Sequence, residues 1–561
     1  MARSLMVLGT ASNVGKSVLC TALCRILAQD GYRVAPFKAQ NMSLNSAATP
    51  SGREIGRAQA VQAMACGILP NEHMNPVLLK PMQGHRTQVV LQGRVYETTS
   101  AREYLRDRLG AVWAAVLESH RYLAQRYEVL VMEGAGSPVE MNLKPRDIAN
   151  LRMAEAADAD VILAADIDRG GVFAAVVGTL HLMTERERAR VMGVVINKFR
   201  GDPALFEDGV RLLESYTGVP VLGVIPYIPH LNIEAEDSVA LEPQGHPERR
   251  EPRPGDVRVA IVQLPHIANF TDFDPLFLEP GVFAWFCRRP EDLAGAHAVI
   301  LPGSKFTMRD LMWLRETGMD RAVAERLAGG ADVVGVCGGY QMLGRRVADP
   351  LGAESDLREM AGLGWLPVVT TMAAKKRTLL VEGELQGVFP GIGVAGYEIH
   401  MGRTDRDPGV PPFARVRRAG AQPLGEAAGA DGVDGPAEAD GVAGMDGVAG
   451  ADGVDGLDGA VGRDGRVMGT YLHGIFDNDG FRRAWLARLR SRFGLPEPAA
   501  PPPQMAAVRE AALDRLADVV RAHLRMDVIY RRLGPPGGST AAARDAAGLR
   551  MPSAVRGGEG R

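Results

Sequence analysis

Apolar runs of strand length alternate with longer segments of helical periodicity over about the first 230 residues of the chain. Five of these runs are short, continuous and apolar, which is typical of strands that are buried on both faces. They are SLMVLG (4–9), RVAPFK (33–38), VLVMEG (129–134), VILAAD (161–166) and VMGVVINK (191–198). Strands of this kind, separated by helix-length segments, predict a parallel sheet with helices on both of its faces.

A second series of strand-like runs follows a segment rich in Pro, Gly and charged residues, EPQGHPERREPRPGD (242–256). That composition is typical of an interdomain linker. The runs after it are VRVAIVQL (257–264), HAVILPG (297–303) and DVVGVCGGY (332–340). They predict a second α/β domain, so the expected fold class is α/β with two parallel-sheet domains.

These patterns divide the chain into five expected parts. They are a first α/β domain (1–240), a linker (241–255), a second α/β domain (256–482), a helical segment (483–535) and a flexible tail (536–561). In the helical segment, apolar residues at helical spacing predict a terminal helix over 505–533.

One region of the second domain departs from the α/β pattern. Between Ala430 and Gly465 the dipeptide Asp-Gly occurs eight times. The nonapeptide pattern of calcium-binding repeats is not met, whereas Asp-Gly is common in turns and flexible loops. We therefore expect a solvated, disordered insertion at about 425–465, without regular strands and without a catalytic role.

Composition narrows the class of protein further. The formal net charge is 64 − 67 = −3, whereas nucleic-acid binders usually carry a basic excess. No apolar run reaches the roughly 18 residues of a membrane span, and MARSLMVLG is expected to form a first strand rather than a signal peptide. We therefore expect neither nucleic acid nor a membrane as a partner.

The five cysteines do not suit a disulfide framework, because their number is odd and their spacings are irregular. Cys20 and Cys24 are four residues apart on a predicted helix, where core packing is favoured over a metal site. We expect the reducing cytoplasm as the compartment.

The most informative feature of the first domain is GTASNVGKS (9–17), which follows the first strand and opens a helix. Such loops bind phosphate through backbone N–H groups and the helix N-terminus. Lys16 would reach the β- and γ-phosphates of ATP, and the Ser17 hydroxyl would ligate Mg²⁺. The spacing is not the standard one, because five residues rather than four separate the first two glycines. The expected nucleotide-binding residues of the loop are Gly9, Thr10, Asn13, Gly15, Lys16 and Ser17.

Charged and amide side chains follow several other strands of the same sheet. Ligands of open α/β sheets bind outside the carboxyl ends of the strands, so Glu133 is placed to meet a metal ion or its water. Lys38 ends the second run and Asn197 lies in the fifth. We expect both at the nucleotide, with Asn197 on an adenine edge, although an ordinary turn residue is the alternative there. The fourth run ends in three further charged residues, Asp166, Asp168 and Arg169.

The segment VVGVCGGYQMLG (333–344) is the most specific feature of the second domain. A buried strand leads into small residues around Cys337 and then into a helix, which allows the sharp turn that exposes a nucleophile. The helix N-terminus would favour the reactive thiolate. The Gly338 N–H would face the developing oxyanion, with a second donor from Gly303 or Ser304. The alternative is a buried structural cysteine.

A cysteine nucleophile needs a base, and two histidines compete for that role. His473 follows a short predicted strand in GTYLHGIFD (469–477), whereas His400 lies in GYEIHMGR (396–403). We favour His473, because a histidine at the end of a strand is placed at the same sheet edge as the cysteine.

Together these motifs resemble those of the cobyric acid synthase family, over roughly residues 1–535. The resemblance implies a dethiobiotin-synthetase-like P-loop domain followed by a class I glutamine amidotransferase domain. The motifs that carry it are GTASNVGKS, KAQNMSLNS (38–46), EGAGSPVEMNL (133–143), DIDRGGVFA (166–174), NKFRGD (197–202), GVCGGYQMLG (335–344) and YLHGIF (471–476).

The resemblance also implies the chemistry. Four side-chain carboxylates of adenosylcobyrinic acid a,c-diamide, a cobalt corrinoid, would be amidated with ATP and glutamine. Cys337 would release ammonia through a thioester, and the P-loop domain would activate each carboxylate. ATP and Mg²⁺ are then cosubstrates, and no tightly bound prosthetic group is expected. The residues expected at the corrinoid are Gln40, Asn41, Asn45, Asp166, Asp168 and Arg169.

Two positions depart from the family pattern. Ala39 replaces the usual Pro after the lysine of the KPQNM motif, and Ile475 lies where many class I amidotransferases have a Glu. We therefore assign no third member of the Cys–His site.

Three other functions compete with this interpretation. The first is the sibling enzyme that makes the a,c-diamide itself, against which QNMSLNS (40–46) argues. The second is a P-loop switch ATPase of the partitioning type, which would carry a lysine where this chain has Ala11. The third is a cysteine peptidase fused to an inactive nucleotide domain.

Overall fold

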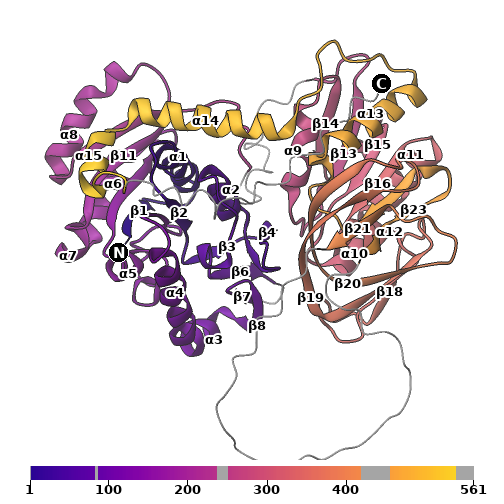
Figure 1. Ribbon diagram of the computed structural model, residues 1–561, viewed down its shortest axis with the longest axis horizontal. Helices are drawn as coiled ribbons and strands as arrows, with labels where there is room; N and C mark the ends of the chain where they lie inside the picture. The colour runs from indigo at the N-terminus through magenta and orange to yellow at the C-terminus, as the bar shows by residue number, and fades with distance from the viewer. Residues whose placement is uncertain (1, 83–85, 235, 237–250, 419–454, 538–561) are drawn as a thin grey trace, which may run out of the picture.

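The computed structural model describes residues 2–82, 86–234, 236, 251–418 and 455–537. Two α/β halves lie side by side, the N-terminal half (residues 2–236) and the C-terminal half (residues 251–503), each built on a six-stranded sheet (Figure 1). Most of the expected linker, residues 425–454 of the expected insertion and residues 538–561 of the expected tail lie outside the described residues. No helix in the described part of the chain combines the length and the apolar character that crossing a bilayer requires.

A parallel sheet with the strand order β12-β11-β10-β1-β9-β2 forms the core of the N-terminal half. Each of the five predicted runs overlaps one of its strands, so the predicted parallel sheet is confirmed. The strands are β1 (Arg3–Gly9), β2 (Val34–Phe37), β9 (Val129–Glu133), β10 (Asp160–Asp166), β11 (Val191–Phe199) and β12 (Val221–Pro226).

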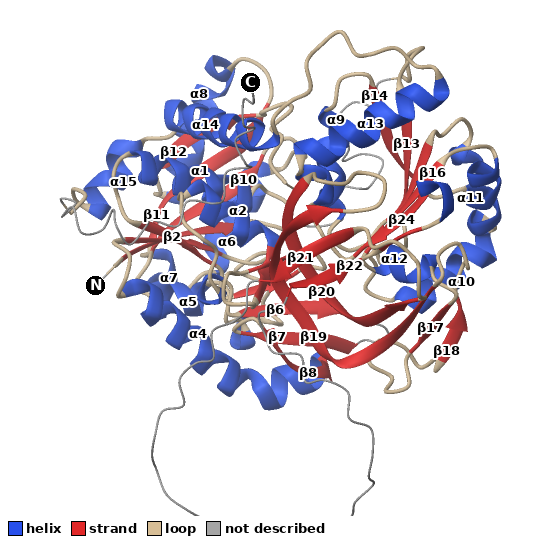
Figure 2. Ribbon diagram, turned by 45° about the vertical axis from the view of Figure 1, so that its right-hand side comes forward, coloured by secondary structure: helices blue, strands red, loops and turns tan. Residues whose placement is uncertain are grey.

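Helices cover both faces of this sheet (Figure 2). The helices of this half are α1 (Lys16–Gln29), α2 (Arg57–Ala65), α3 (Ala101–Glu103), α4 (Leu109–Ala124), α5 (Leu151–Ala156), α6 (Val172–Leu182), α7 (Glu185–Arg188) and α8 (Glu207–Thr217). A smaller sheet, β3-β6-β7-β8, and a hairpin, β4-β5, lie on the side that faces the C-terminal half (Figure 1). Their strands are β3 (Gln40–Met42), β4 (Ser46–Ala48), β5 (Glu54–Gly56), β6 (Val77–Pro81), β7 (Arg86–Leu91) and β8 (Arg94–Ser100).

The C-terminal half contains the second sheet, in the order β14-β13-β15-β16-β24-β23, in which only the β23–β24 pair is antiparallel. Three of its strands coincide with the predicted runs. The strands are β13 (Val257–Val262), β14 (Val282–Cys287), β15 (Ala298–Leu301), β16 (Asp332–Val336), β23 (Ala460–Val461) and β24 (Val467–Thr470). The flanking helices are α9 (Asp274–Leu278), α10 (Thr307–Thr317), α11 (Met319–Ala328), α12 (Gly338–Leu343) and α13 (Asp479–Phe493).

A third large sheet, mostly antiparallel, packs beside it and carries the surface that meets the N-terminal half. Its order is β18-β17-β19-β21-β22, with β20 paired to β19. Tyr397 and Ile399 of β20 pack against Ala48 of β4, which joins the two halves through a small apolar cluster. The strands are β17 (Arg346–Ala348), β18 (Glu359–Ala361), β19 (Val368–Leu385), β20 (Gly393–Arg406), β21 (Ala414–Arg418) and β22 (Asp455–Asp458).

The C-terminal helices return to the N-terminal half. α14 (Met505–His523) runs across both halves (Figure 1), and its apolar side chains join the core cluster that contains α1. The predicted helix over 505–533 is in fact two helices, α14 and α15 (Met526–Leu533). The break occurs at Leu524, because this residue forms an antiparallel bridge to Gly223 of β12.

Residues 455–461 contradict the expectation of an insertion without regular strands. β22 pairs with β21 and β23 pairs with β24, so this end of the segment completes two sheets. The buried Asp458 carboxylate accepts hydrogen bonds from the Thr470 hydroxyl and, at 3.1 Å, from the Tyr471 N–H. These contacts fix a stretch whose Asp-Gly composition by itself predicts only turns.

Asp458→Ala is expected to lower the free energy of unfolding by about 1–3 kcal/mol, because it leaves a buried hydroxyl and a buried N–H without this acceptor. The measurement is chemical denaturation of the full chain. Leu457→Ala, at a side chain that is half exposed, is the matched control and should change stability little. Equal loss in both variants would contradict the role given to the carboxylate.

Candidate active site

Cys337 lies at the sharp turn between β16 and α12. Its φ is +52°, in the left-handed region that non-glycine residues rarely adopt. The turn needs small neighbours: a Cβ at Gly339 would overlap the Leu301 carbonyl, and a Cβ at Gly338 would lie 2.7 Å from the Ser304 nitrogen. This is the geometry of a nucleophile elbow, in which backbone strain presents one side chain at the sheet edge.

His473 and Asp272 form a buried pair beside Cys337. His473 Nδ1 lies 2.6 Å from Asp272 Oδ2, and both side chains are 1% exposed. Asp272 Oδ1 accepts further hydrogen bonds from the Gly474 N–H at 3.2 Å and from the Tyr397 hydroxyl at 3.4 Å. The carboxylate therefore orients the imidazole through Nδ1 and leaves Nε2 for the thiol.

The charge of this site follows from its neighbours. Burial lowers the pKa of His473, but the negative charges of Asp272 and Cys337 outweigh burial and raise that pKa to about 10. An imidazole that keeps its proton at neutral pH stabilises the thiolate beside it, and the thiolate is the nucleophilic form of cysteine. The arrangement thus suits nucleophilic attack followed by proton donation to a leaving group.

The loop after β15 borders the same two side chains. A Cβ at Gly303 would lie 3.3 Å from His473 Cε1 and 3.8 Å from Cys337 Cβ. Ser304 Oγ donates to Asp310 Oδ2 at 2.6 Å, which fixes the loop on α10. The structure therefore brings together the two segments expected to supply oxyanion donors, Gly338 and Gly303.

His400 lines the same pocket as Cys337 but is bound differently. Its Nδ1 lies 2.7 Å from the Gly402 carbonyl, and its ring stacks on Tyr471 with centroids 3.7 Å apart. Burial also lowers its pKa. This geometry favours His473 over His400 as the base.

The sequence carries only a weak signal for Asp272. It precedes His473 by 201 residues, and nothing in the spacing links the two. It does lie between Phe270 and Phe273, both buried, and a carboxylate among buried aromatic residues requires a partner. That pattern could have marked Asp272 as unusual without naming its role.

The glycine loop between β1 and α1 has the geometry of a phosphate-binding loop. Asn13 and Gly15 have φ values of +60° and +97°, and α1 begins directly afterwards. Lys16 Nζ donates to the carbonyls of Ala11 and Gly136 at 3.0 Å each, and its burial lowers its pKa. The ammonium is therefore directed into the mouth of the loop, where phosphate would bind.

Contacts on either side hold this loop in shape. A Cβ at Gly9 would lie 2.6 Å from the Val14 side chain, and the Thr10 N–H donates to the Ala164 carbonyl at 2.9 Å. Asn197 Nδ2 donates to the Val14 carbonyl at 2.9 Å. Asn197, expected on an adenine edge, thus contacts the loop backbone.

The expected corrinoid residues at the end of β10 lie at the same sheet edge. Asp166 pairs at 2.8 Å with Lys198, whose ammonium also donates to the Asn13 carbonyl at 2.6 Å. Asp168 and Arg169 are exposed, and Asp168 pairs with Arg200 at 2.7 Å. Asp166 is therefore linked to the glycine loop, whereas the other two lie at its open mouth.

The expected metal ligands Ser17 and Glu133 lie together. Ser17 Oγ donates to Glu133 Oε1 at 2.9 Å, and the same oxygen accepts from Lys38 Nζ at 2.7 Å. Gln62 Nε2 donates to Glu133 Oε2 at 2.6 Å. Burial lowers the pKa of Lys38, but Glu133 and Glu236 outweigh burial and hold that pKa above its usual value.

Glu236 is a member of this cluster that the sequence analysis missed. Its Oε2 lies 2.6 Å from Ser17 Oγ and is the alternative to Glu133 as acceptor of the single hydroxyl hydrogen, and its Oε1 pairs with Lys38. Hydroxyl and carboxylate oxygens are the ligands that Mg²⁺ prefers. No group of three or more His, Cys, Asp or Glu side chains in the described chain is arranged to hold a metal alone. Nucleotide-bound Mg²⁺, however, takes most of its ligands from phosphates and water.

Asn45 connects the two halves. Its Oδ1 accepts from the Asn269 N–H at 2.8 Å, and Asn269 Oδ1 accepts from the Ser46 N–H at 2.9 Å. Asn269 Nδ2 lies 3.5 Å from His473 Nδ1. Asn45, expected at the corrinoid, therefore contacts the loop beside the histidine.

The other two amides of the QNM segment are bound within the N-terminal half. Gln40 Oε1 accepts from the Tyr104 hydroxyl at 2.7 Å, and Asn41 Nδ2 donates to Gln59 Oε1 at 3.1 Å.

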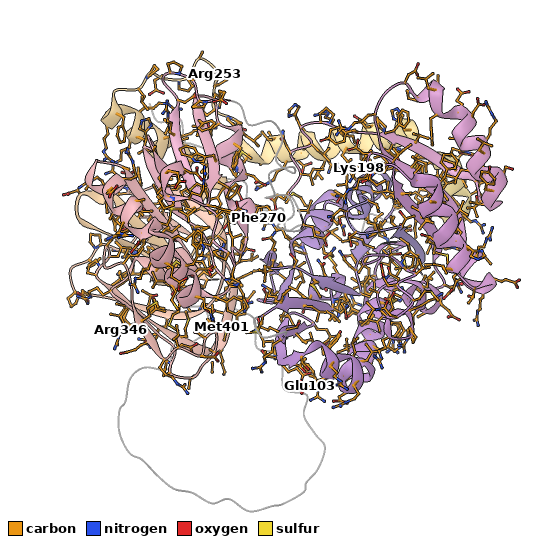
Figure 3. All side chains as sticks on the ribbon, turned by 180° about the vertical axis from the view of Figure 1, so that it is seen from behind. Glu103, Lys198, Arg253, Phe270, Arg346 and Met401 are labelled. Atoms are coloured by element: carbon orange, nitrogen blue, oxygen red, sulfur yellow. The ribbon has the colours of Figure 1, made fainter. Side chains whose placement is uncertain are left out.

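The pocket in front of Cys337 is lined by both halves. Leu44, Ser46 and Lys80 come from the N-terminal half, whereas Cys337 and His473 come from the C-terminal half. Met401, which also lines the pocket, lies on the side of the C-terminal half that faces the N-terminal half (Figure 3). The thiol therefore opens toward the domain junction.

Comparison with protein families divides the chain in the same way. Residues 5–239 match the CobQ/CobB/MinD/ParA nucleotide binding domain. Residues 258–481 match the CobB/CobQ-like glutamine amidotransferase domain.

Curated relatives match along nearly the whole chain. A cobyric acid synthase of Klebsiella pneumoniae is 48% identical over 539 residues, covering 94% of this chain and 98% of the relative. One of Syntrophobacter fumaroxidans is 48% identical over 542 residues, covering 95% and 99%. A match to a solved glutamine amidotransferase covers 42% of this chain and 98% of that structure's chain, at 19% identity and a TM-score of 0.27.

Asp272→Asn is expected to lower glutamine hydrolysis on the order of 10²–10⁴-fold, because the imidazole loses its orienting charge. The same change removes the anion that raises the pKa of His473, so the alkaline limb of the pH–rate profile should move to lower pH. The measurement is kcat for glutamate release between about pH 6 and about pH 11, a range that includes the His473 pKa of about 10. An unchanged alkaline limb would contradict the assigned pair.

Proposed function

Because the chain belongs to the cobyric acid synthase family, we propose that it amidates four side-chain carboxylates of adenosylcobyrinic acid a,c-diamide with ATP and glutamine. Members of this family are glutamine-dependent amidoligases, and this chain is one. The product would be adenosylcobyric acid, an intermediate of cobalamin biosynthesis. The observation that supports this most strongly is the presence of two chemically distinct sites in one chain, with the thiol site opening toward the nucleotide-binding half.

The C-terminal half would release ammonia from glutamine. The Cys337 thiolate attacks the carboxamide carbon, and the N–H groups of Gly338 and Gly303 stabilise the negative oxygen that forms. The His473 imidazolium then gives its proton to the leaving ammonia, and a thioester remains. Water hydrolyses the thioester to glutamate and restores the thiolate. Asp272 keeps the imidazole oriented through both steps.

The N-terminal half would activate the corrinoid carboxylate. The glycine loop and Lys16 bind the phosphates of ATP and stabilise the charge of the transferred phosphoryl group. A carboxylate oxygen attacks the γ-phosphorus, ADP leaves, and an acyl phosphate forms. Ammonia then attacks the carbonyl carbon and displaces phosphate, which yields the amide. The exposed Asp168 and Arg169, at the mouth of β10, are the residues that we propose at the corrinoid.

Mg²⁺ is the cation that we propose for the nucleotide. Ser17 and Glu133 would hold it together with the phosphates, with Glu236 as a third oxygen donor, and it would neutralise charge on the transferred phosphoryl group.

The competing functions fit less well. A partitioning-type switch ATPase does not require a buried Cys–His–Asp arrangement. A peptidase does not require a glycine loop whose lysine is directed into the phosphate-binding mouth. The curated relatives carry the name of the later enzyme rather than of the a,c-diamide synthase. We also propose the cytoplasm as the compartment, supported by five free cysteines.

Cys337→Ala is expected to abolish glutamine-dependent amidation, by roughly 10³-fold or more, because the nucleophile is lost. Amidation with high ammonium should continue, because carboxylate activation uses the other half. The measurement is ATP-dependent mass gain of the corrinoid with each nitrogen source. His473→Ala should behave in the same way, whereas His400→Ala should keep much of the glutamine-dependent rate.

Lys16→Ala is expected to eliminate amidation with either nitrogen source, because acyl phosphate formation precedes attack by ammonia. Glutamine hydrolysis should survive at least in part, since its nucleophile and base lie in the other half. The measurement is ammonium-driven amidation by the folded variant. Near-normal turnover would refute the proposal that this loop binds ATP for the ligase reaction.

A further inference from the structure

Five charged side chains from both halves are gathered at the pocket in front of Cys337. Four of them line the pocket itself: Lys80, Lys305, Lys376 and Glu354. The fifth, Glu54, is 1% exposed and lies directly behind them. Burying so many charges is costly unless each has a partner, so the pairing within the cluster is informative.

The Glu54 carboxylate forms ion pairs with two of the three lysines. It pairs with Lys80 of its own half and, at 2.6 Å, with Lys376 of the other half. Lys80 also donates to Ser46 Oγ at 2.9 Å. These two ammonium groups are therefore satisfied within the protein, and together they dock β6 against β19.

Lys305 has no such partner. It is 8% exposed, and among the described residues no carboxylate lies within ion-pair distance of its ammonium. Its hydrogen bond goes to a neutral oxygen, Gln88 Oε1 of the N-terminal half, at 3.1 Å. Burial lowers the pKa of Lys305 to about 8. A buried ammonium that faces a pocket and forms no direct ion pair with a carboxylate of the described residues favours an anionic ligand.

Glu354 presents the complementary group. Its Oε2 is buried and has no hydrogen-bond partner among the described residues. Burial raises the pKa of Glu354 to about 7, against the opposing effect of Lys305. A positively charged ligand group at this oxygen would restore the ionised carboxylate.

We infer that Lys305 binds the α-carboxylate of glutamine and Glu354 binds its α-ammonium group, in a pocket that Lys80 and Ser46 of the N-terminal half complete. One unpaired cation and one unpaired carboxylate oxygen match the two charges of a free amino acid. The carboxamide at the other end of the same molecule reaches Cys337, which lines the same pocket. The inference rests on the proposed function, and it makes the glutamine site a joint product of both halves.

Two glutamine analogues, each lacking one of the two charged groups, test the Lys305 contact and the Glu354 contact separately. 4-Carbamoylbutanoate lacks the α-amino group, and 4-aminobutanamide lacks the α-carboxylate. Lys305→Gln should raise the KM for glutamine and the inhibition constant of 4-carbamoylbutanoate roughly 10- to 100-fold, with 4-aminobutanamide unaffected. Glu354→Gln should show the reverse selectivity. In both variants kcat should remain near the wild-type value, because neither side chain is assigned to the chemistry.

Lys375→Gln is the matched control, since this neighbouring lysine is exposed and does not line the pocket in front of Cys337. It should change none of these constants. Ammonium-driven amidation by each variant reports that the halves remain folded and docked. Equal weakening of both glutamine analogues, or a fall in kcat with KM unchanged, would overturn the inference. Wild-type protein that releases no glutamate at all would instead refute the proposed function.

Discussion

The 2.6 Å hydrogen bond between His473 Nδ1 and Asp272 Oδ2 is the interaction on which the arrangement of this molecule depends. It joins the segments that follow β13 and β24, and it gives the imidazole the charge that the thiolate of Cys337 requires. Next to it, Asn269 Oδ1 accepts a hydrogen bond from the N–H of Ser46, which belongs to the other half. Tyr397, which stacks on the His473 ring, also packs against Ala48 of the other half. Catalytic geometry and domain docking therefore share one set of side chains, so a displacement of one half relative to the other reaches the histidine through Asn269 and Tyr397.

In both halves the functional residues lie at the carboxyl edge of a parallel sheet, although the chemistry proposed for the two edges differs. A parallel sheet directs the carboxyl ends of its strands to one edge, and a sharp turn into a helix brings backbone N–H groups to that edge. In the N-terminal half this edge holds a glycine loop, with Lys16 and Glu133, which we propose for phosphate and metal. In the C-terminal half it holds a strained Cys337, beside the backbone N–H groups that we propose for the developing oxyanion. The antiparallel ribbon of β19 and β20 then closes the junction between the two edges.

The features that could be predicted from sequence are local ones. Continuous apolar runs identified eight strands of the two parallel sheets, and the glycine-flanked Lys16 and Cys337 indicated their chemistry from adjacent residues alone. What could not be predicted depends on contacts between distant segments. Asp272 lies 201 residues before its histidine, and Glu236 reaches Ser17 across 219 residues. The strands at residues 455–461 have a composition typical of loops, and only the buried Asp458 carboxylate and the pairing partners make them strands.

The return of α14 to the N-terminal half has a consequence for how the protein is made. Arg25 of α1 donates a hydrogen bond to Asp514 of α14, although Asp514 lies 489 positions later in the chain and is therefore synthesised much later. Until then, the part of this apolar cluster that α14 and α15 cover is exposed to solvent, while the second half is being synthesised. The N-terminal half therefore completes its core after the C-terminal half has emerged, which reverses the usual order of vectorial folding. During that interval the nascent chain presents an apolar surface of the kind that chaperones bind.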